Sequence, residues 1–279
     1  MAHKLTIIAA LGLTASAVFM GAAAAIGGRD LDDGFEGFFN SRPRCEAVAG
    51  ARATSRDLDW DGSDHVELAI PAQASYAPGN GDKLHATGDP QILAHLRVRD
   101  GDIELDCRGW RNRSKGLAIT LPGRQFRKFA IAGGGGMILD RLDQSRVAIE
   151  IAGSGSVKAN GKIDDLKMEI AGSGDADFDQ LTAREASVEI GGSGTVRAKG
   201  SIDDLKIEIA GSGRADFGQV TTRNARVEIA GHGNVDIAPS EEAKIEIGGS
   251  GDVYLHSNPK RLETDIGGSG RIHRLPAGG

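Results

Sequence analysis

A repeat of 18 to 20 residues in the second half of the chain restricts its fold more than any other feature. The motif Ile-small-Gly-x-Gly recurs at intervals of 20, 19, 20, 19, 20, 18 and 19 residues, beginning at Ile131, Ile151, Ile170, Ile190, Ile209, Ile229, Ile247 and Ile266. Two units also form a longer duplication, in which Ser156–Gly194 matches Thr195–Gly233 at 26 positions. A fixed period of this length indicates a structural unit that stacks on copies of itself.

Each unit alternates apolar and polar residues and then reaches a pair of glycines. The run Leu205-Lys206-Ile207-Glu208-Ile209, for example, precedes Gly211-Ser212-Gly213. Alternation with period 2 indicates β-strands, and glycine adopts the corner conformations that other residues resist. The unit is too short for a four-stranded propeller blade and lacks the helix signals of leucine-rich or ankyrin repeats. We therefore predict an all-β fold, a single-stranded parallel β-helix (solenoid) with 19–20 residues per coil.

Stacking of these coils predicts ladders of equivalent residues. Inward positions after the glycine corner alternate between small and large pairs: Val157/Ala159, Ala176/Phe178, Val196/Ala198 and Ala215/Phe217. Alternating volumes allow successive layers to fill one core. The outward position between them reads Lys158, Asp177, Arg197, Asp216 and Asp236. The first four alternate in sign, which neighbouring strands prefer, so we expect the units to stack in sequence order.

The sequence divides into four segments. Residues 1–25 are typical of a secretory signal peptide, with Lys4 before an apolar run and small residues up to Ala25. An uncleaved anchor is the alternative, but the run is shorter than the roughly 20 residues that cross a bilayer. We interpret residues 26–45 as a tether, although their aromatic residues could instead pack on the head. Residues 46–120 are a β-rich head, continuous with the helix and covering its N-terminal end, and residues 121–279 are the β-helix repeats.

The predicted export bears on the two cysteines, Cys45 and Cys107. An oxidising compartment favours a disulfide between them, and two unrelated thiols are the alternative. Their spacing, without paired histidines, is not that of a zinc site. We expect a protein of the periplasm or of the cell surface and extracellular space, without an integral membrane segment after signal cleavage.

The charge of the chain argues against two classes of partner. Lys and Arg number 33 against 39 Asp and Glu, a net charge of −6. Nucleic acids and anionic membrane surfaces both require a concentrated basic surface, so we expect neither as a partner.

The order of features resembles the GIN-domain family, also called auto-transporter adhesin heads. The resemblance lies in residues 84–90 (LHATGDP), 96–105 (LRVRDGDIEL) and 119–122 (ITLP), followed by the recurring Ile-x-Gly-Ser-Gly-x-Val units, and it covers roughly residues 50–272. It implies a secreted, right-handed β-helix without an established enzymatic activity and with no catalytic residues to transfer. The chain departs from a true autotransporter in having no C-terminal translocator segment.

A ladder of carboxylates just before each glycine corner is the most regular chemical feature: Glu150, Glu169, Glu189, Glu208, Glu228, Glu246 and Asp265. Two residues earlier, on the same face, stand Lys167, Ser187, Lys206, Arg226 and Lys244. One interpretation is a solvated face of interleaved ion pairs. The other is a binding ladder, which collects calcium or binds a repeating polymer through its regular charges. Calcium requires 6 to 8 oxygen ligands and the lysines oppose it, so we predict no metal site and no cofactor.

Other candidates have simpler structural explanations. The pairs Asp164-Asp165 and Asp203-Asp204 repeat within the duplication, whereas a catalytic site is normally built once, so we interpret them as solvent-facing corners. We interpret His232 as an exposed substitution in a ladder of turn serines: Ser154, Ser173, Ser193, Ser212, Ser250 and Ser269. The aromatic residues Trp60, Tyr76, Trp110 and Tyr254 could stack on sugar rings or anchor the core, and Trp110 is our candidate for a glycan contact.

We predict no catalytic residues and expect a non-enzymatic envelope module with an adhesin-like, binding or structural role, whose partner is a polysaccharide or an envelope protein. The alternative is a polysaccharide-cleaving β-helix enzyme resembling pectate lyase. Such an enzyme would need several carboxylates and a basic residue at one level of a groove.

Overall fold

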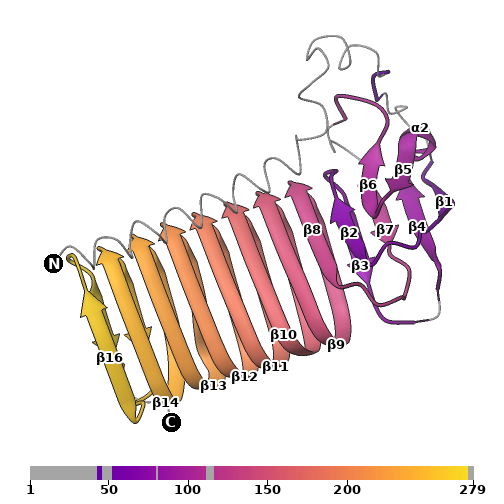
Figure 1. Cartoon of the computed structure of the whole chain (residues 1–279). Helices are drawn as coiled ribbons and strands as arrows, with labels where there is room; N and C mark the ends of the chain where they lie inside the picture. Colours follow the sequence, from indigo (N-terminus) through magenta and orange to yellow (C-terminus); the bar gives the residue numbers. More distant parts are fainter. Residues whose placement is uncertain (1–42, 46–51, 80, 111–115, 276–279) are drawn as a thin grey trace.

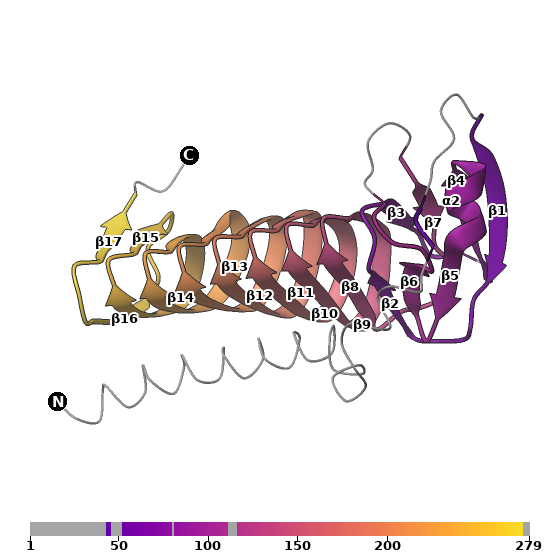
Figure 2. The same cartoon turned by 90° about the horizontal axis from the view of Figure 1, so that it is seen from above.

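The computed structural model describes residues 43–45, 52–79, 81–110 and 116–275. The predicted signal peptide and nearly all of the predicted tether lie outside these residues. The described chain forms a rod of stacked β-coils with a smaller β-rich head at one end (Figures 1 and 2). This confirms the all-β, parallel solenoid fold predicted from the repeat.

Long strands that bend around corners form the body of the rod. From β8 to β14 each strand pairs in parallel with the next in sequence order, and at the C-terminal end β15 and β16 both pair with β14 while β17 pairs with β15. Their bounds are β8 Lys128–Gly133, β9 Gly136–Gly153, β10 Ser156–Gly172, β11 Asp175–Gly192, β12 Thr195–Gly211, β13 Arg214–Gly231, β14 Asn234–Gly249, β15 Asp252–Leu255, β16 Arg261–Ile266 and β17 Arg271–Arg274. The isoleucine of every repeat pairs with the isoleucine of the next, from Ile131 to Ile266. Equivalent residues of successive repeats are therefore paired, and the period of the repeat sets the register of the sheet.

Both ladders predicted after the glycine corner are present. Val157, Ala176, Val196 and Ala215 are in register and buried, and the small residue Ala159 lies between Leu139 and Phe178. On the outside, Asp177 pairs in register with Lys158 and Arg197, and Arg197 Nη1 lies 3.4 Å from Asp177 Oδ1.

The alternation between 19- and 20-residue repeats has a local cause at the second corner of the coil. There the register shifts so that Ala159 and Gly161 of β10 face Phe178 and Leu181 of β11, which accommodates one extra residue in β11. The extra residue, Gln180, has a φ of 55°, while Gly161 has a φ of 128°. One coil thus turns this corner with a glycine and the next with a bulge, a difference that leaves the flanking ladders in register.

The head completes the N-terminal end of the stack. Its elements are β1 Thr54–Asp59, β2 His65–Leu68, β3 Gln73–Tyr76, β4 Lys83–Gly88, α2 Pro90–His95, β5 Leu96–Arg99, β6 Asp102–Leu105 and β7 Ala118–Thr120. Strands β2 and β3 pair in parallel with β8 and β9, so part of the segment predicted as head forms a coil of the rod. Strands β6 and β7 add to this coil in parallel, and beyond them β5 pairs with β6 and β4 with β7 in antiparallel fashion.

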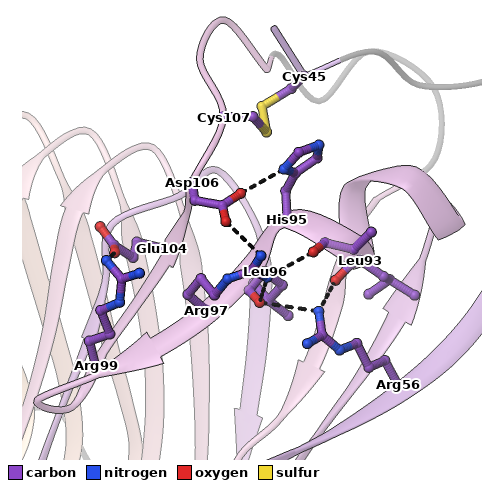
Figure 3. A network of polar contacts seen from close by, with 11 residues as sticks. Cys45, Arg56, Leu93, His95, Leu96, Arg97, Arg99, Glu104, Asp106 and Cys107 are labelled. Atoms are coloured by element: carbon purple, nitrogen blue, oxygen red, sulfur yellow. Dashed lines mark hydrogen bonds and ion pairs between the residues drawn. A yellow bond between two sulfur atoms is a disulfide. The ribbon is translucent and has the colours of Figure 1, made fainter. Parts of the chain in front are cut away.

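The short helix α2 covers the apolar end of the rod with Ile92 and Leu93, both buried. Asp89 caps its N-terminus by accepting a hydrogen bond from the backbone N–H of Gln91. Two arginines satisfy its C-terminal carbonyls, because Arg56 donates to the carbonyl oxygens of Leu93 and Leu96, and Arg97 to those of Ala94 and Leu96 (Figure 3).

A disulfide secures the chain entering the head. Cys45 and Cys107 are bonded, which confirms the predicted pair, and the backbone N–H of Cys45 donates to the carbonyl oxygen of Arg108. Next to the disulfide, the Asp106 carboxylate lies 2.6 Å from both His95 Nδ1 and Arg97 Nη2 (Figure 3). The segment at Cys45 is therefore attached to the capped end of the rod.

We predict that replacing both Cys45 and Cys107 by serine lowers the free energy of unfolding by roughly 2–5 kcal/mol, because the bond closes a loop across 62 residues. Urea denaturation of the variant and of the wild type, each with and without reductant, measures the change. An unchanged urea midpoint in the variant would contradict a stabilising role for the bond.

The glycine corner gives a second prediction. Gly172 has a φ of 125°, and a Cβ at this position would lie 2.5 Å from the carbonyl oxygen of Gly153 in the coil below. We expect Gly172→Ala to lower the free energy of unfolding by roughly 2–5 kcal/mol through backbone strain and overpacking. The neighbouring exposed Ser173→Ala should change it by less than about 0.5 kcal/mol. Similar urea midpoints for the two variants would show that the corner does not require glycine.

Candidate functional site

The predicted carboxylate ladder exists as a continuous column on one face of the rod. Glu150, Glu169, Glu189, Glu208, Glu228, Glu246 and Asp265 pair in register, one per coil. The column lies near the end of the strands β9–β14 and on β16, the strands labelled along the rod in Figure 1. Because adjacent strands are about 4.8 Å apart, neighbouring carboxylates are close enough to repel one another.

A second column, two residues earlier in each strand, supplies most of the compensating charge. Lys128 Nζ lies 2.7 Å from Glu150 and Lys244 Nζ 2.9 Å from Glu246. Lys167 and Lys206 form ion pairs with Glu169 and Glu208 of their own coils. The hydrogen bond to Glu169 raises the pKa of Lys167. The face is therefore an ordered set of ion pairs between half-buried carboxylates and longer basic side chains.

Arg226 contacts carboxylates of two coils. Its Nε lies 2.6 Å from Glu228 Oε1 and its Nη2 3.7 Å from Glu246, so one guanidinium connects two coils. Glu228 is only 8% exposed, and the hydrogen bond to this carboxylate raises the pKa of Arg226. A planar guanidinium with several donors suits this bridging position better than a lysine.

Glu189 interrupts the pattern of compensation. The position that would supply its cation is Ser187, which lies in register between Lys167 and Lys206. Burial raises the pKa of Glu189, and the adjacent carboxylates Glu169 and Glu208 raise it further, while Lys167 and Lys206 lower it. Glu189 thus lacks the basic residue two positions earlier in its own strand, whereas Glu169 and Glu208 in the flanking coils each have one.

The ladder also has an N-terminal extension that the sequence did not indicate. Glu67 of β2 pairs in register with Ala130, the residue that precedes Glu150 in the column. Burial raises the pKa of Glu67, and Asp102, its in-register neighbour on β6, raises it further. The period of the repeat does not reach β2, so only the pairing in space shows that Glu67 continues the column.

A third column, at the edge of this face, contains the corner aspartates. Asp165 and Asp204 pair in register with Glu185, and the column as a whole is Arg146, Asp165, Glu185, Asp204, Asn224, Glu242 and Arg261. Ion pairs join Arg146 to Asp165 at 3.2 Å and Arg223 to Asp203 at 2.7 Å. The aspartate pairs therefore lie at an outward corner of the coils, in agreement with the interpretation made from the sequence.

We define the acidic face as these three columns of the coils from Lys128 to Ile266. They contain twelve acidic and seven basic side chains, a net charge of −5. The outward positions on the other side of the glycine corner, in the columns that begin at Ser156 and Lys158, contain five acidic and four basic side chains. The acidic face therefore has a larger net negative charge than the side that follows the glycine corner.

The serines of the glycine corners and His232 are exposed, as the sequence predicted. Among residues 43–45, 52–79, 81–110 and 116–275, no group of three or more His, Cys, Asp or Glu side chains is placed to hold a metal ion. The acidic face therefore presents alternating charges rather than a convergent set of ligands.

The aromatic residues divide between the head core and the C-terminal coils. Tyr76 is buried and donates to the carbonyl oxygen of Arg124, while Trp60 packs edge-on against Phe126 with ring centroids 5.3 Å apart. Trp110 is half-buried and packs against the core. Tyr254 stacks on His273 at 4.7 Å between centroids. Three of the four aromatics therefore pack in or against the hydrophobic core at the head.

Sequence reasoning missed a polar cluster where the repeat loses its regularity. Asp236, 8% exposed, lies 2.8 Å from Arg214 Nη2 and 3.0 Å from His256 Nε2. The His256 ring occupies the space that a side chain at position 218 would fill. A signal was present, because Gly218 replaces Asp179 of the duplicated unit.

Glu189 allows a test of the electrostatic account. A carboxyl group whose pKa is raised by folding stabilises the protein when protonated, and the folded state loses this stability as the pH rises through the folded-state pKa. We predict that Glu189→Gln increases the free energy of unfolding at pH 7 by about 0.2–1 kcal/mol, and that the gain disappears below the ordinary carboxyl pKa of 4.5. Urea denaturation between pH 4 and pH 8, roughly, spans this range.

Glu208→Gln is the matched control, because this carboxylate has the ion pair with Lys206 that Glu189 lacks. Its substitution should leave stability at pH 7 unchanged or lower it. An equal gain from both variants would show that Glu189 is not electrostatically distinct, and a gain from Glu189→Gln that persists at low pH would contradict a charge effect.

Comparisons with known proteins agree with the architecture. The sequence profile of the family described as "Putative auto-transporter adhesin, head GIN domain" matches residues 64–259. Two crystal structures from Parabacteroides distasonis are similar, a "putative lipid binding protein" with 21% identity and a TM-score of 0.72 and a "putative adhesin" with 14% and 0.73. A "putative adhesin" from Parabacteroides merdae has 14% identity and a TM-score of 0.72. Each alignment covers 81% of this chain and 98% of the other.

No curated protein sequence matches the chain. The similarity to the solved structures concerns the fold, whereas the family profile spans the head from β2 onward and the coils as far as β15. The chain therefore belongs to the GIN-domain family of auto-transporter adhesin heads.

Proposed function

We propose that this protein is an exported, non-enzymatic, adhesin-like binding module whose acidic face binds regularly spaced basic groups of an envelope protein or a polysaccharide. The observation that carries the proposal is the net charge of −5 on the acidic face. Charges that repeat every coil, about 4.8 Å apart, favour a partner that is itself extended and repetitive.

Ser187 is the position where we expect such a partner to bind most strongly. The three carboxylates of Glu169, Glu189 and Glu208 share two lysines, so this part of the face has an excess negative charge. A basic group from a partner would occupy the place between Lys167 and Lys206 that a cation has in neighbouring coils. Because the carboxylates are already half-buried and ordered, binding would cost little additional side-chain entropy.

Several observations support export. The sequence of residues 1–25 is typical of a signal peptide, and a disulfide joins Cys45 to Cys107. No helix in the described part of the chain is long and apolar enough to span a bilayer. Membership in a family of adhesin heads is consistent with action in the envelope or at the cell surface.

The distribution of polar residues supports a binding role over an enzymatic one. The carboxylates recur in coil after coil, with ion-pair partners in most of them, whereas a catalytic site requires a single level with a distinct acid, base and positioning group. The related proteins are described as an adhesin head, adhesins and a lipid-binding protein. Trp110, half-buried in the head, remains our predicted contact for a glycan.

Retention on immobilised polymers tests the proposal. The probes are poly-L-lysine and chitosan as cationic polymers, with neutral and acidic polysaccharides as comparisons, and chain cleavage is recorded together with retention, with and without calcium. We predict salt-sensitive retention on the cationic probes without cleavage, because contacts between exposed charges weaken as the Debye length falls below about 10 Å.

Matched variants locate the binding surface. The triple variant Glu169→Gln, Glu189→Gln, Glu208→Gln should weaken retention at least about tenfold, while Asp175→Asn, Asp177→Asn, Asp216→Asn, on the other side of the glycine corner, should change it less than about threefold. Equal losses would contradict the acidic face as the site. Cleavage of any polysaccharide would overturn the non-enzymatic proposal, and loss of glycan retention in Trp110→Ala would assign glycan binding to the head.

A further inference from the structure

The column of basic residues on the acidic face has one gap beside the glutamate ladder. In β10, β12, β13 and β14 the residue two positions before the glutamate is Lys or Arg and forms an ion pair with it. Lys128 of β8 supplies the cation for Glu150 of β9. In β11 the corresponding residue is Ser187. Among the ladder glutamates of the described strands β9–β14, Glu189 is therefore the one without an ion pair.

Two longer basic side chains flank this gap. Ser187 pairs in register with Lys167 of β10 and with Lys206 of β12, so a lysine-bearing strand lies about 4.8 Å away on either side along the rod. Ser187 and Glu189 are both half-buried, and each therefore retains some contact with solvent. A cation from solvent that enters between the two lysines thus approaches the Glu189 carboxylate where the lysines contact their own glutamates.

Arg226 shows how a guanidinium occupies the equivalent position two coils further along the rod. Its Nε lies 2.6 Å from Glu228 Oε1 in its own strand, and its Nη2 lies 3.7 Å from Glu246 Oε1 in the next coil. Glu246 also lies 2.9 Å from Lys244 Nζ, so one glutamate of the ladder accepts both cations. The neighbours of Ser187 in its own strand and in the next coil are of the same kinds in the same order: Glu189, Lys206 and Glu208.

We propose that the gap at Ser187 binds one arginine side chain from an extended segment of a partner protein, with its guanidinium between Glu189 and Glu208. This inference rests on the proposed function, because it names the partner and the position of its basic group on the acidic face. The partner's arginine would take the role that Arg226 has in its own coil. Glu208 would then accept two cations, as Glu246 does.

The length and shape of arginine distinguish it from lysine and from amino sugars. Within the described chain, each of the four lysines in this column forms an ion pair with one carboxylate, whereas the planar guanidinium of Arg226 reaches two. The ammonium group of an amino sugar is attached directly to its ring, so the ring itself would have to enter between Lys167 and Lys206. In arginine a chain of methylenes carries the guanidinium past these lysines. The gap therefore favours a protein over a polysaccharide.

The gap also gives the acidic face a position that differs from the rest of the ladder. In most coils the ladder offers a carboxylate with a paired cation, so a repetitive partner could shift by one coil, about 4.8 Å, with little change in its contacts. The missing ion pair of β11 breaks this equivalence, because an arginine gains a partner there that it gains at no other glutamate of β9–β14. A bound arginine would therefore fix the register of an extended partner along the rod.

Fluorescence anisotropy with labelled peptides at low salt, using the full chain, tests the inference. The probes are hexalysine and the same peptide with one central lysine replaced by arginine. We expect the arginine peptide to bind the wild type at least about threefold more tightly, because one guanidinium contacts two carboxylates. Ser187→Lys fills the gap and should abolish this preference. Ser156→Lys is the matched control, because it adds the same charge on the other side of the glycine corner, and it should retain the preference.

Equal affinity of the two peptides for the wild type, or a preference that persists in Ser187→Lys, would overturn the arginine site and leave the proposed function standing. Failure of both peptides to bind the wild type would contradict the proposed function as well. Glu189→Gln is a second variant that should abolish the preference, and the thermal unfolding of every variant establishes that it is folded.

Carbodiimide cross-linking of the peptide lysines to carboxylates, read by mass spectrometry, tests the register. Cross-links of the arginine peptide to the wild type should concentrate on ladder glutamates within about two coils of Glu189. In Ser187→Lys they should spread along the ladder, because the distinguishing position is then filled. An even spread in the wild type would contradict a fixed register.

Discussion

In-register parallel hydrogen bonding between successive coils is the constraint on which the rest of this structure depends. It places each side chain against the residue at the same position of the next repeat, from Ile131 to Ile266. For apolar residues this arrangement stabilises the fold, because the ladders of Ile and Val form one continuous core. For glutamates it brings like charges together and requires compensation. The ion pairs with Lys128, Lys167, Lys206, Arg226 and Lys244 offset the repulsion that the in-register backbone pairing imposes on these glutamates.

The same constraint explains which parts of the sequence vary in length. An extra residue cannot be inserted within a ladder without turning every following side chain to the opposite face. The variation between 18 and 20 residues is confined to the corner near Gly161 and Gln180, where a bulge or a glycine absorbs it. The glycine corner at Gly172 has the opposite character, because each of its glycines lies directly against the backbone of the coil below.

Most of the rod could be predicted from the sequence because its period and its alternation report the register directly. The stacking order, the carboxylate ladder, the alternating charges at Lys158, Asp177 and Arg197, and the disulfide were all accessible in this way. The insertion of β2 and β3 between β6–β7 and β8–β9 was not, because these pairings join residues far apart in the sequence without a repeat. For the same reason Glu67 and the cluster of Asp236 with His256 became visible only in space.

The central claim is that the acidic face, rather than the head or the other sides of the rod, is the binding surface. Carbodiimide labelling of carboxylates, read by mass spectrometry with and without bound oligolysine, tests it residue by residue. The account predicts that oligolysine protects Glu169, Glu189 and Glu208 most strongly and leaves Asp175, Asp177 and Asp216 reactive. Protection confined to the head, or spread evenly over all exposed carboxylates, would contradict it.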